Sequence, residues 1–375
     1  MTYRLTHSGI LLGLVAFFGQ APSAVIAPLA GALIDRLDRH RVIVITQIAA
    51  ALQSAALALF AFTGWMTVWH LMALGAVQAV INAFDMPARQ SFLQHMIEDR
   101  ADLPNAIALN SSMVNGARLL GPVFAAELVA FFGEGWCFAI DAASYIAVIA
   151  SLLMMRVPKQ PPRANRAGVW SGMVEGWTYV MSEPLVRSVL LLLAATSVLG
   201  GAYATLLPMI APDPHQLGIL MAAVGCGALA GALYLASRSS VVGLGGVIAR
   251  VTITLAGALI GMRFIAGYAA IPLLVVTGAS FMVQMAGTNT IVQTIVEPAK
   301  LGRVMSLYGV AFFGGMPLGA LTLGSLADRI GPTNAFLCAG LAVLACGIAF
   351  AVVLPGLRKA SRPTYVRLGL IPADQ

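Results

Sequence analysis

Polar residues recur at helical spacing inside apolar stretches of this sequence. They are Gln78, Asn82, Asp85 and Arg89 in one stretch and Ser111, Asn115, Arg118 and Pro122 in the next. At about 100° per residue, each set falls on a narrow stripe along one face of a helix. Polar side chains inside an apolar helix are expensive. The two stripes therefore predict neighbouring helices that either line a shared aqueous cavity or hydrogen-bond each other in a closed core.

Asp85 and Arg89 are the charged pair of the first stripe. A spacing of four residues allows an ion pair on one helix face, which is the plainer interpretation. Burial raises the affinity of a carboxylate for protons, so Asp85 is alternatively a proton carrier. Both interpretations remain open, and we assign Asp85 and Arg89 to proton coupling and Gln78, Asn82, Ser111, Asn115 and Arg118 to a substrate cavity.

Arg118 lies deepest of the charged residues. Counted from Pro104 at about 1.5 Å per residue, it lies about 21 Å along its helix, beyond the midplane of a ~30 Å hydrocarbon core. A guanidinium there must find an anion or water. Asp85 and Asp141 are candidate partners, and an anionic group of a bound substrate is the alternative. Asp141 and Glu127 lie nearer the outer surface and have weaker claims to function.

The composition identifies the class of protein. The chain has 375 residues, of which 59% are hydrophobic and 10% charged, whereas a soluble domain has about a quarter charged residues. Apolar runs of about twenty residues are long enough to cross a bilayer as a helix. Eleven runs are found, at 8–34, 42–64, 66–88, 104–131, 136–155, 187–210, 215–236, 242–262, 269–296, 304–327 and 333–354. Since lipid offers no hydrogen-bond partner to an open strand edge, we predict an all-α membrane protein with eleven transmembrane helices.

The net charge of +7 is explained by membrane topology rather than by nucleic acid binding. Eighteen of the 22 basic residues follow odd-numbered spans and therefore lie on one side of the membrane. Basic loops remain in the cytoplasm. We predict an integral protein of a bacterial inner membrane with a cytoplasmic C-terminus.

The sequence repeats itself at an offset of about 200 residues. The stretch 94–98 recurs as 293–297, and Gly121 and Gly133 recur as Gly319 and Gly331. Such duplication is typical of transporters built from two homologous helix bundles. The predicted units are an N-terminal bundle at 1–156, a cytoplasmic linker at 157–170, a C-terminal bundle at 171–356 and a cytoplasmic tail at 357–375.

The repeat also predicts a missing element. The span at 187–210, shifted by 200 residues, has a partner that would end just after Met1. We therefore expect two six-helix bundles of which the first lacks its first helix here. A true eleven-span protein is the alternative, and a truncated chain of this kind could also be non-functional.

The segment GALIDRLDRHR, at 31–41, resembles the loop signature of the major facilitator superfamily. The matching residues are Gly31, Asp35, Arg36, Arg39 and Arg41. The segment departs from the signature at Asp38 and His40. The resemblance implies that this loop is part of a gate. Asp35 can cap or pair with the inner end of a neighbouring helix, although Arg36 and Arg41 could simply fix the topology.

The segment from Asp85 to Leu128 resembles the branch of this superfamily that contains drug and siderophore exporters. Within it, GARLLGPVFAA is similar to the antiporter motif, with matches at Gly121 and Pro122 and alanines in place of its other glycines. The resemblance implies a hinge at Gly121 and Pro122. It also implies twelve helices in two bundles, alternating access and export driven by a proton gradient.

Other function classes lack their motifs in this sequence. No GxxxxGK[ST] loop accompanies the three lysines, and HExxH, GxSxG and metal-ligand clusters are missing. We therefore predict a secondary transporter and not an enzyme, without cofactor or metal. Its expected partners are a small-molecule substrate, a proton gradient and the lipid bilayer, and we expect a monomer. An importer or uniporter of the same fold is the alternative.

Overall fold

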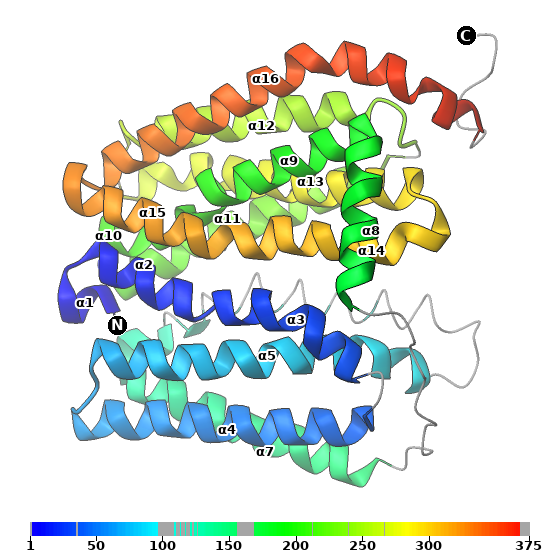
Figure 1. Ribbon diagram of the computed structural model, residues 1–375. Coiled ribbons are helices and arrows are strands. Elements are labelled where there is room, and N and C mark those ends of the chain that lie inside the picture. The colour runs from blue at the N-terminus through cyan, green and yellow to red at the C-terminus, as the bar shows by residue number, and fades with distance from the viewer. Residues whose placement is uncertain are drawn as a thin grey trace.

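The computed structural model describes most of the chain. The described residues are 2–34, 37–96, 109, 113, 117, 121, 124–125, 127–155, 169–211, 213–238, 240–265 and 267–367. Within them, the regular structure is helical (Figure 1). The first half of the chain contributes α1 (Thr2–Thr6), α2 (Gly9–Phe18), α3 (Ala21–Ile34), α4 (Arg39–Thr63), α5 (Val68–Met96) and α7 (Glu134–Met154).

The second half contains longer helices with several interruptions. Its elements are α8 (Val169–Ser182), α9 (Pro184–Leu199), η1 (Gly201–Thr205), α10 (Leu207–Ile210), α11 (Pro214–Ala236), α12 (Leu244–Gly261), η2 (Gly267–Ala270), α13 (Ile271–Ile295), α14 (Pro298–Gly309), η3 (Val310–Gly314), α15 (Gly315–Ile330) and α16 (Pro332–Arg367). In Figure 1 the first-half helices α2, α3, α4, α5 and α7 lie below those of the second half. Nearly all of the helices lie roughly horizontal in this view. The exception, α8, crosses the right-hand ends of its neighbours.

Ten helices among the described residues are long and apolar enough to cross a membrane, so the predicted membrane class is confirmed. The remaining predicted span, 104–131, lies largely outside the described residues. Large apolar side chains point outward, including Trp65 at 76% and Phe131 at 76% exposure. An outer surface of this kind is suited to lipid rather than to water.

Three predicted spans are interrupted in the structure. The predicted run 8–34 breaks between α2 and α3 at Gly19 and Gln20, and the run 187–210 breaks after Leu199. Proline and glycine explain these breaks, because proline lacks an N–H and glycine weakens a helix interior. The predicted run 304–327 contains the π-helical turn η3. The predicted tail from residue 357 begins as helix, since α16 continues to Arg367.

The two halves share local geometry and packing, as the sequence repeat predicts. Gly133 has φ 82° and ψ 169°, and its counterpart Gly331 has φ 85° and ψ 154°. Only glycine adopts this conformation readily. In the first half α4 packs on α5 and α7, and in the second half α12 packs on α13 and α16.

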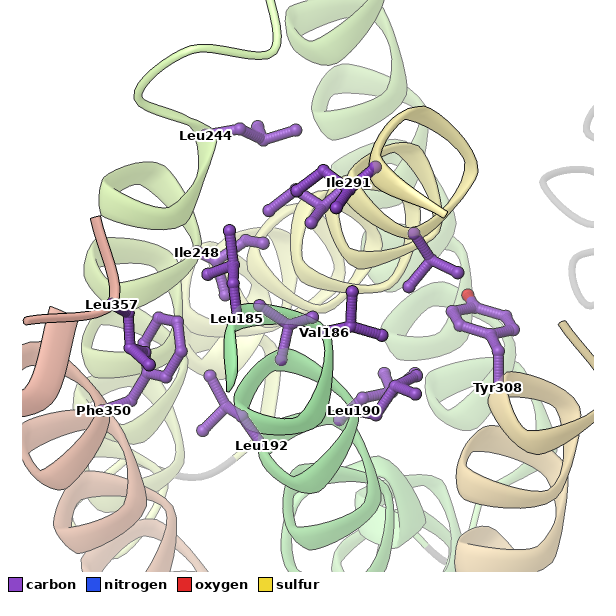
Figure 2. Close-up of a cluster of buried hydrophobic side chains, with 14 of the residues drawn as sticks. Leu185, Val186, Leu190, Leu192, Leu244, Ile248, Ile291, Tyr308, Phe350 and Leu357 are labelled. Atoms are coloured by element: carbon purple, nitrogen blue, oxygen red, sulfur yellow. The ribbon is translucent and has the colours of Figure 1, made fainter. Parts of the chain in front are cut away.

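Buried apolar side chains are concentrated in the second half. Figure 2 shows one such cluster, in which Val186 and Leu190 of α9 lie between Ile248 of α12 and Tyr308 of α14. The corresponding first-half cluster is smaller and includes Ile34, Ile43 and Phe92. Membrane helices gain little from hydrophobic exclusion against lipid, so close packing and small residues determine which helices associate.

The helices run between two ends of the molecule. One end, on the right in Figure 1, contains the start of α4, the end of α11 and the start of α14. We call it the basic end, because these helix ends include or adjoin Arg39, Arg41, Arg238, Lys300 and Arg303. At the opposite end, on the left, α2 begins at Gly9 against α15. We call this the contact end.

Candidate functional site

Asp85 is the centre of a polar cluster between α4 and α5. Its Oδ1 accepts hydrogen bonds from Thr46 Oγ1 at 2.8 Å and from Gln47 Nε2 at 2.9 Å. Its Oδ2 accepts from Arg89 Nε at 2.6 Å. The Asp85 side chain is 14% exposed and that of Arg89 is 48% exposed. The carboxylate therefore joins two helices and binds a guanidinium that still reaches the surface.

The stripe continues along α5 toward the contact end. Gln78 Nε2 donates to Asn82 Oδ1 at 3.2 Å. Gln78 Oε1 and Gln47 Oε1 are buried without a hydrogen-bond partner among the described residues. Unpaired buried acceptors are costly, so these two oxygens are candidate contacts for a polar ligand.

A second carboxylate, Asp141 of α7, lies about two turns further along the same face of α4. Ser54 Oγ donates to Asp141 Oδ2 of α7 at 2.5 Å. Tyr145, one turn further along α7, interacts electrostatically with Asp141, Asp85 and Arg89. The charged groups of the first half thus form one neighbourhood across α4, α5 and α7.

The second half has neutral residues at the matching positions. At an offset of 199, Asp85 corresponds to Gln284 and Arg89 to Thr288, and both counterparts are buried. Gln284 Nε2 donates to Thr196 Oγ1 of α9 at 2.7 Å. An amide and a hydroxyl cannot exchange a proton at neutral pH, so the ionisable chemistry belongs to the first half.

Several predicted residues lie outside the described residues. They are Asp35, Arg36, Ser111, Asn115, Arg118 and Pro122. Gly121 is helical, and no atom lies within 4 Å of where its Cβ would be. Gly31 lies within α3. The cavity stripe on 104–131 and the predicted hinge therefore remain predictions.

The loop motif contains a residue whose role the sequence did not show. Asp38, a departure from the superfamily signature, is the N-cap of α4 and accepts from the backbone N–H of His40 at 3.1 Å. Arg39 is buried at 8% exposure. Arg41 pairs with Asp38 at 3.5 Å, but both side chains are exposed, and such a surface pair contributes little.

At the contact end, a carboxylate of one half receives the first turn of a helix from the other. Asp328 of α15 accepts from Ser8 Oγ at 2.9 Å, from Ile10 N at 2.8 Å and from Gly9 N. A negative charge at a helix N-terminus is favourable because the free N–H groups and the helix dipole both point at it. Gly9, Gly13 and Gly324 allow this approach, since a Cβ on Gly13 would lie 2.6 Å from Ala320 O.

A second link between the halves involves Glu127 and His215. Glu127 Oε1 lies 2.5 Å from His215 Nδ1, on the first turn of α11. Both side chains are more than a third exposed. The halves are thus joined by acidic groups at two places on the described parts of the contact end.

The basic end is arranged differently. On α14, no described atom outside the helix's own turns lies within 4 Å of a Cβ built on Gly302 or Gly309. The helix α8 packs on α14. Glu175 pairs with Arg303, and Lys300 Nζ lies 4.7 Å from the centre of the Tyr179 ring.

Thr46, Gln47 and Asp328 were not identified from sequence. Each is a polar residue in an apolar run, which is a usable signal. Their partners, however, are 38 or more residues away in the chain and depend on how the helices are rotated against each other. Asp141 and Glu127, given weaker claims from sequence, both have specific partners.

Comparison with known proteins agrees with this architecture. The family described as transmembrane secretion effector matches residues 2–364. The chain is 29% identical to the multidrug efflux pump Tap of Mycolicibacterium fortuitum, over 96% of this chain and 92% of that protein. It is 25% identical to the enterobactin exporter EntS of Shigella boydii serotype 4, over 95% and 86%.

Among solved structures, the fold is shared with a bacterial homologue of the human lysosomal transporter Spinster, in an inward-facing and unoccupied conformation. The TM-score is 0.68 at 15% identity, over 99% of this chain and 92% of that chain.

Proposed function

Because the chain belongs to the transmembrane secretion effector family, within the major facilitator superfamily, we propose that it exports small hydrophobic or amphipathic molecules in exchange for protons. It is a membrane transporter and not an enzyme. The names of its relatives, a multidrug efflux pump and an enterobactin exporter, support export of drug-like or siderophore-like compounds. The membrane we assign is a bacterial inner membrane.

The basic end faces the cytoplasm in this proposal. Arginine and lysine are retained on the cytoplasmic side during insertion. The C-terminal end of α16, which carries Arg358, Lys359 and Arg362, would then also be cytoplasmic. The contact end faces outward.

Transport proceeds by alternating access of the two halves. The Asp328 link and the glycine contacts of α2 with α15 support a state in which the outward side is closed. The open space beside Gly302 and Gly309 supports access from the cytoplasm. Rocking one half against the other around a central site would open the contact end and close the basic end.

The Asp85 cluster is the single observation that carries proton coupling. A proton that binds Oδ2 of Asp85 removes the charge that holds Arg89, and Oδ2 then becomes a donor instead of an acceptor. The ion pair opens, and the link between α4 and α5 through Thr46 and Gln47 weakens. Loading a proton therefore changes both the charge at the cavity edge and the packing of two helices.

Proteoliposomes with an imposed pH gradient test the proposal. An acidic interior should drive accumulation of a macrolide or a catechol siderophore, because protons leave as substrate enters. Asp85→Asn should lower gradient-driven substrate accumulation at least tenfold, while exchange of substrate across the membrane without a gradient persists. Asp213→Asn, at the N-cap of α11, is the matched control. Gradient-driven accumulation by Asp85→Asn at the wild-type rate would refute the coupling role.

The same preparation separates the alternatives. An importer that moves protons and substrate together requires an acidic exterior instead. A uniporter responds to neither gradient. The sign of the pH effect therefore decides between export, import and uniport on one fold.

A further inference from the structure

Two adjoining hollows lie on the second half, away from the Asp85 cluster. The larger has a volume of ≈ 330 Å³ and lies between Gly231 and Tyr234 of α11, Arg250 and Val251 of α12, and Ala279 and Val283 of α13. The smaller, ≈ 100 Å³, is lined by Leu235, Arg238, Ser240 and Leu244. Gly231, Tyr234 and Leu235 follow one another at helical spacing on one face of α11, and Arg238 comes just after its end, so we treat the two hollows as one groove that reaches the basic end. We call it the α11–α12 groove.

The groove exists because α11 and α12 pack on either side of α13. Glycines allow α11 to approach α13 closely, since a Cβ on Gly231 would lie 2.6 Å from Ala279 O. On the other side, Ile248 of α12 packs against Gly287. The floor is therefore α13, and the two walls end in the connection between α11 and α12.

Two arginines border the groove, and neither has a carboxylate partner within the described part of the chain. Arg250 Nε donates to Gly246 O of its own helix at 3.2 Å, and its guanidinium is exposed. Arg238 Nη2 donates to Val242 O at 3.3 Å, while its buried Nε has no hydrogen-bond partner. A guanidinium pairs well with phosphate oxygens, which accept two parallel hydrogen bonds.

Depth and surroundings indicate which phosphate would bind. Arg250 is six residues inside α12, about 9 Å from the basic end, where a charged side chain needs a counter-ion. The lining of the larger hollow is mainly apolar apart from the arginine, with Val247 and Val251 of α12 and Ala279 and Val283 of α13. The groove continues past the arginines between apolar walls. A soluble anion has no apolar part that could contact these walls, whereas a phospholipid has both a phosphate and an acyl chain.

We propose that the α11–α12 groove binds one anionic phospholipid of the cytoplasmic leaflet. The phosphate lies between Arg238 and Arg250, within reach of the hydroxyls of Tyr234 and Ser240. One acyl chain lies along Gly231, Val251 and Val283. The lipid would hold α11 and α12 together at the end where they diverge. This site is separate from the exchange of protons and substrate and does not depend on it.

Thermal unfolding of the purified protein in a neutral detergent tests the site. Phosphatidylglycerol at 100 times its dissociation constant should raise the unfolding midpoint by about 3 °C. Phosphatidylcholine with the same chains should raise it much less. Inorganic phosphate is the third condition. If phosphate alone reproduces the rise, or if both lipids act equally, the lipid proposal is wrong.

Substitutions locate the effect. Arg238→Gln with Arg250→Gln should remove the preference for phosphatidylglycerol, whereas Arg263→Gln, outside the groove, should keep it. Arg250→Lys should keep part of the preference for phosphatidylglycerol that the double variant loses, because lysine keeps the positive charge. Val251→Trp fills the apolar hollow and should lower the number of lipids retained in native mass spectrometry from one to none. Unchanged lipid retention by both the double variant and Val251→Trp would overturn the assignment.

Discussion

The contact end and the basic end of this molecule use the same residue type to opposite effect. Glycines line both ends of the surface that α14 and α15 present. At the contact end Gly324 lies against the backbone of α2, whereas at the basic end no described atom outside the helix's own turns lies within 4 Å of a Cβ built on Gly302 or Gly309. Glycine therefore permits close approach without causing it.

The difference between the ends is the polar link. Asp328 accepts three hydrogen bonds from Ser8 and the first turn of α2. Glu127 contacts His215 at the same end of the molecule. In the described residues of the basic end, ionic contacts such as Glu175–Arg303 join elements of one half only. We infer that Gly302 and Gly309 are the contact surface of the opposite conformation, in which the basic end closes.

The largest expected effect comes from filling the surface at the contact end where α15 touches α2. Gly324→Leu places side-chain atoms where α2 backbone lies, and overpacking of this kind costs about 1–3 kcal/mol or more. The halves should separate at the contact end and transport should fall at least tenfold. Spin labels at Leu5 and Arg329, after replacement of the four native cysteines, measure the separation by double electron–electron resonance. A wild-type distance distribution with normal transport would contradict the role of Gly324.

The reverse substitution sharpens the comparison at the basic end. Gly309→Leu enters open space, so the described conformation and its thermal stability should be unchanged. Transport should nevertheless be lost, because the basic end could no longer close. Labels at Leu37 and Trp177 report on that end. Full transport by Gly309→Leu would show that this surface is not used in the other conformation.

The sequence predicted most of the helices and one half of the polar site. Apolar length identifies a span without tertiary information, and the four-residue spacing of Asp85 and Arg89 places them together on any helix. The matched backbone of Gly133 and Gly331 follows from the repeat as well. Each of these features depends only on residues near in sequence or on a fixed offset.

Features that depend on helix rotation were not predictable. The bonds of Asp85 to Thr46 and Gln47 require α4 to present one particular face to α5. Asp328 meets Gly9 across 319 residues of sequence. The breaks after Phe18 and Leu199 were also missed, because glycine and proline are common in membrane helices and interrupt only some of them.

A smaller effect is expected from removing the polar link while leaving the glycine contacts. Asp328→Ala loses three hydrogen bonds to a helix N-terminus, which is worth about 1–2 kcal/mol. The contact end should open partially in the Leu5–Arg329 distances. Asp328→Asn should fall between Asp328→Ala and the wild type, because both carboxylate oxygens accept hydrogen bonds and an amide keeps only one acceptor oxygen. Ser325→Ala, which loses only a bond within its own helix, is the control. Equal behaviour of all three variants would leave the glycine contacts as the sole link.

The smallest effect concerns α8 at the basic end and depends on pH. Burial raises the pKa of the Tyr179 phenol, against smaller opposing effects of the Glu297 backbone and Lys300. The undocked α8 would ionise first, as pH rises through about 10. Docking of α8 on α14 is therefore fully stable below that pH and weakens above it, as the phenol ionises. The difference between the phenolate absorbance titrations of the wild type and Tyr179→Phe should correspond to one tyrosine that ionises above the usual pH range. The contact end, held by carboxylates, should not respond over the same range, and simultaneous loss of the Leu5–Arg329 distance would mean that the two ends are coupled.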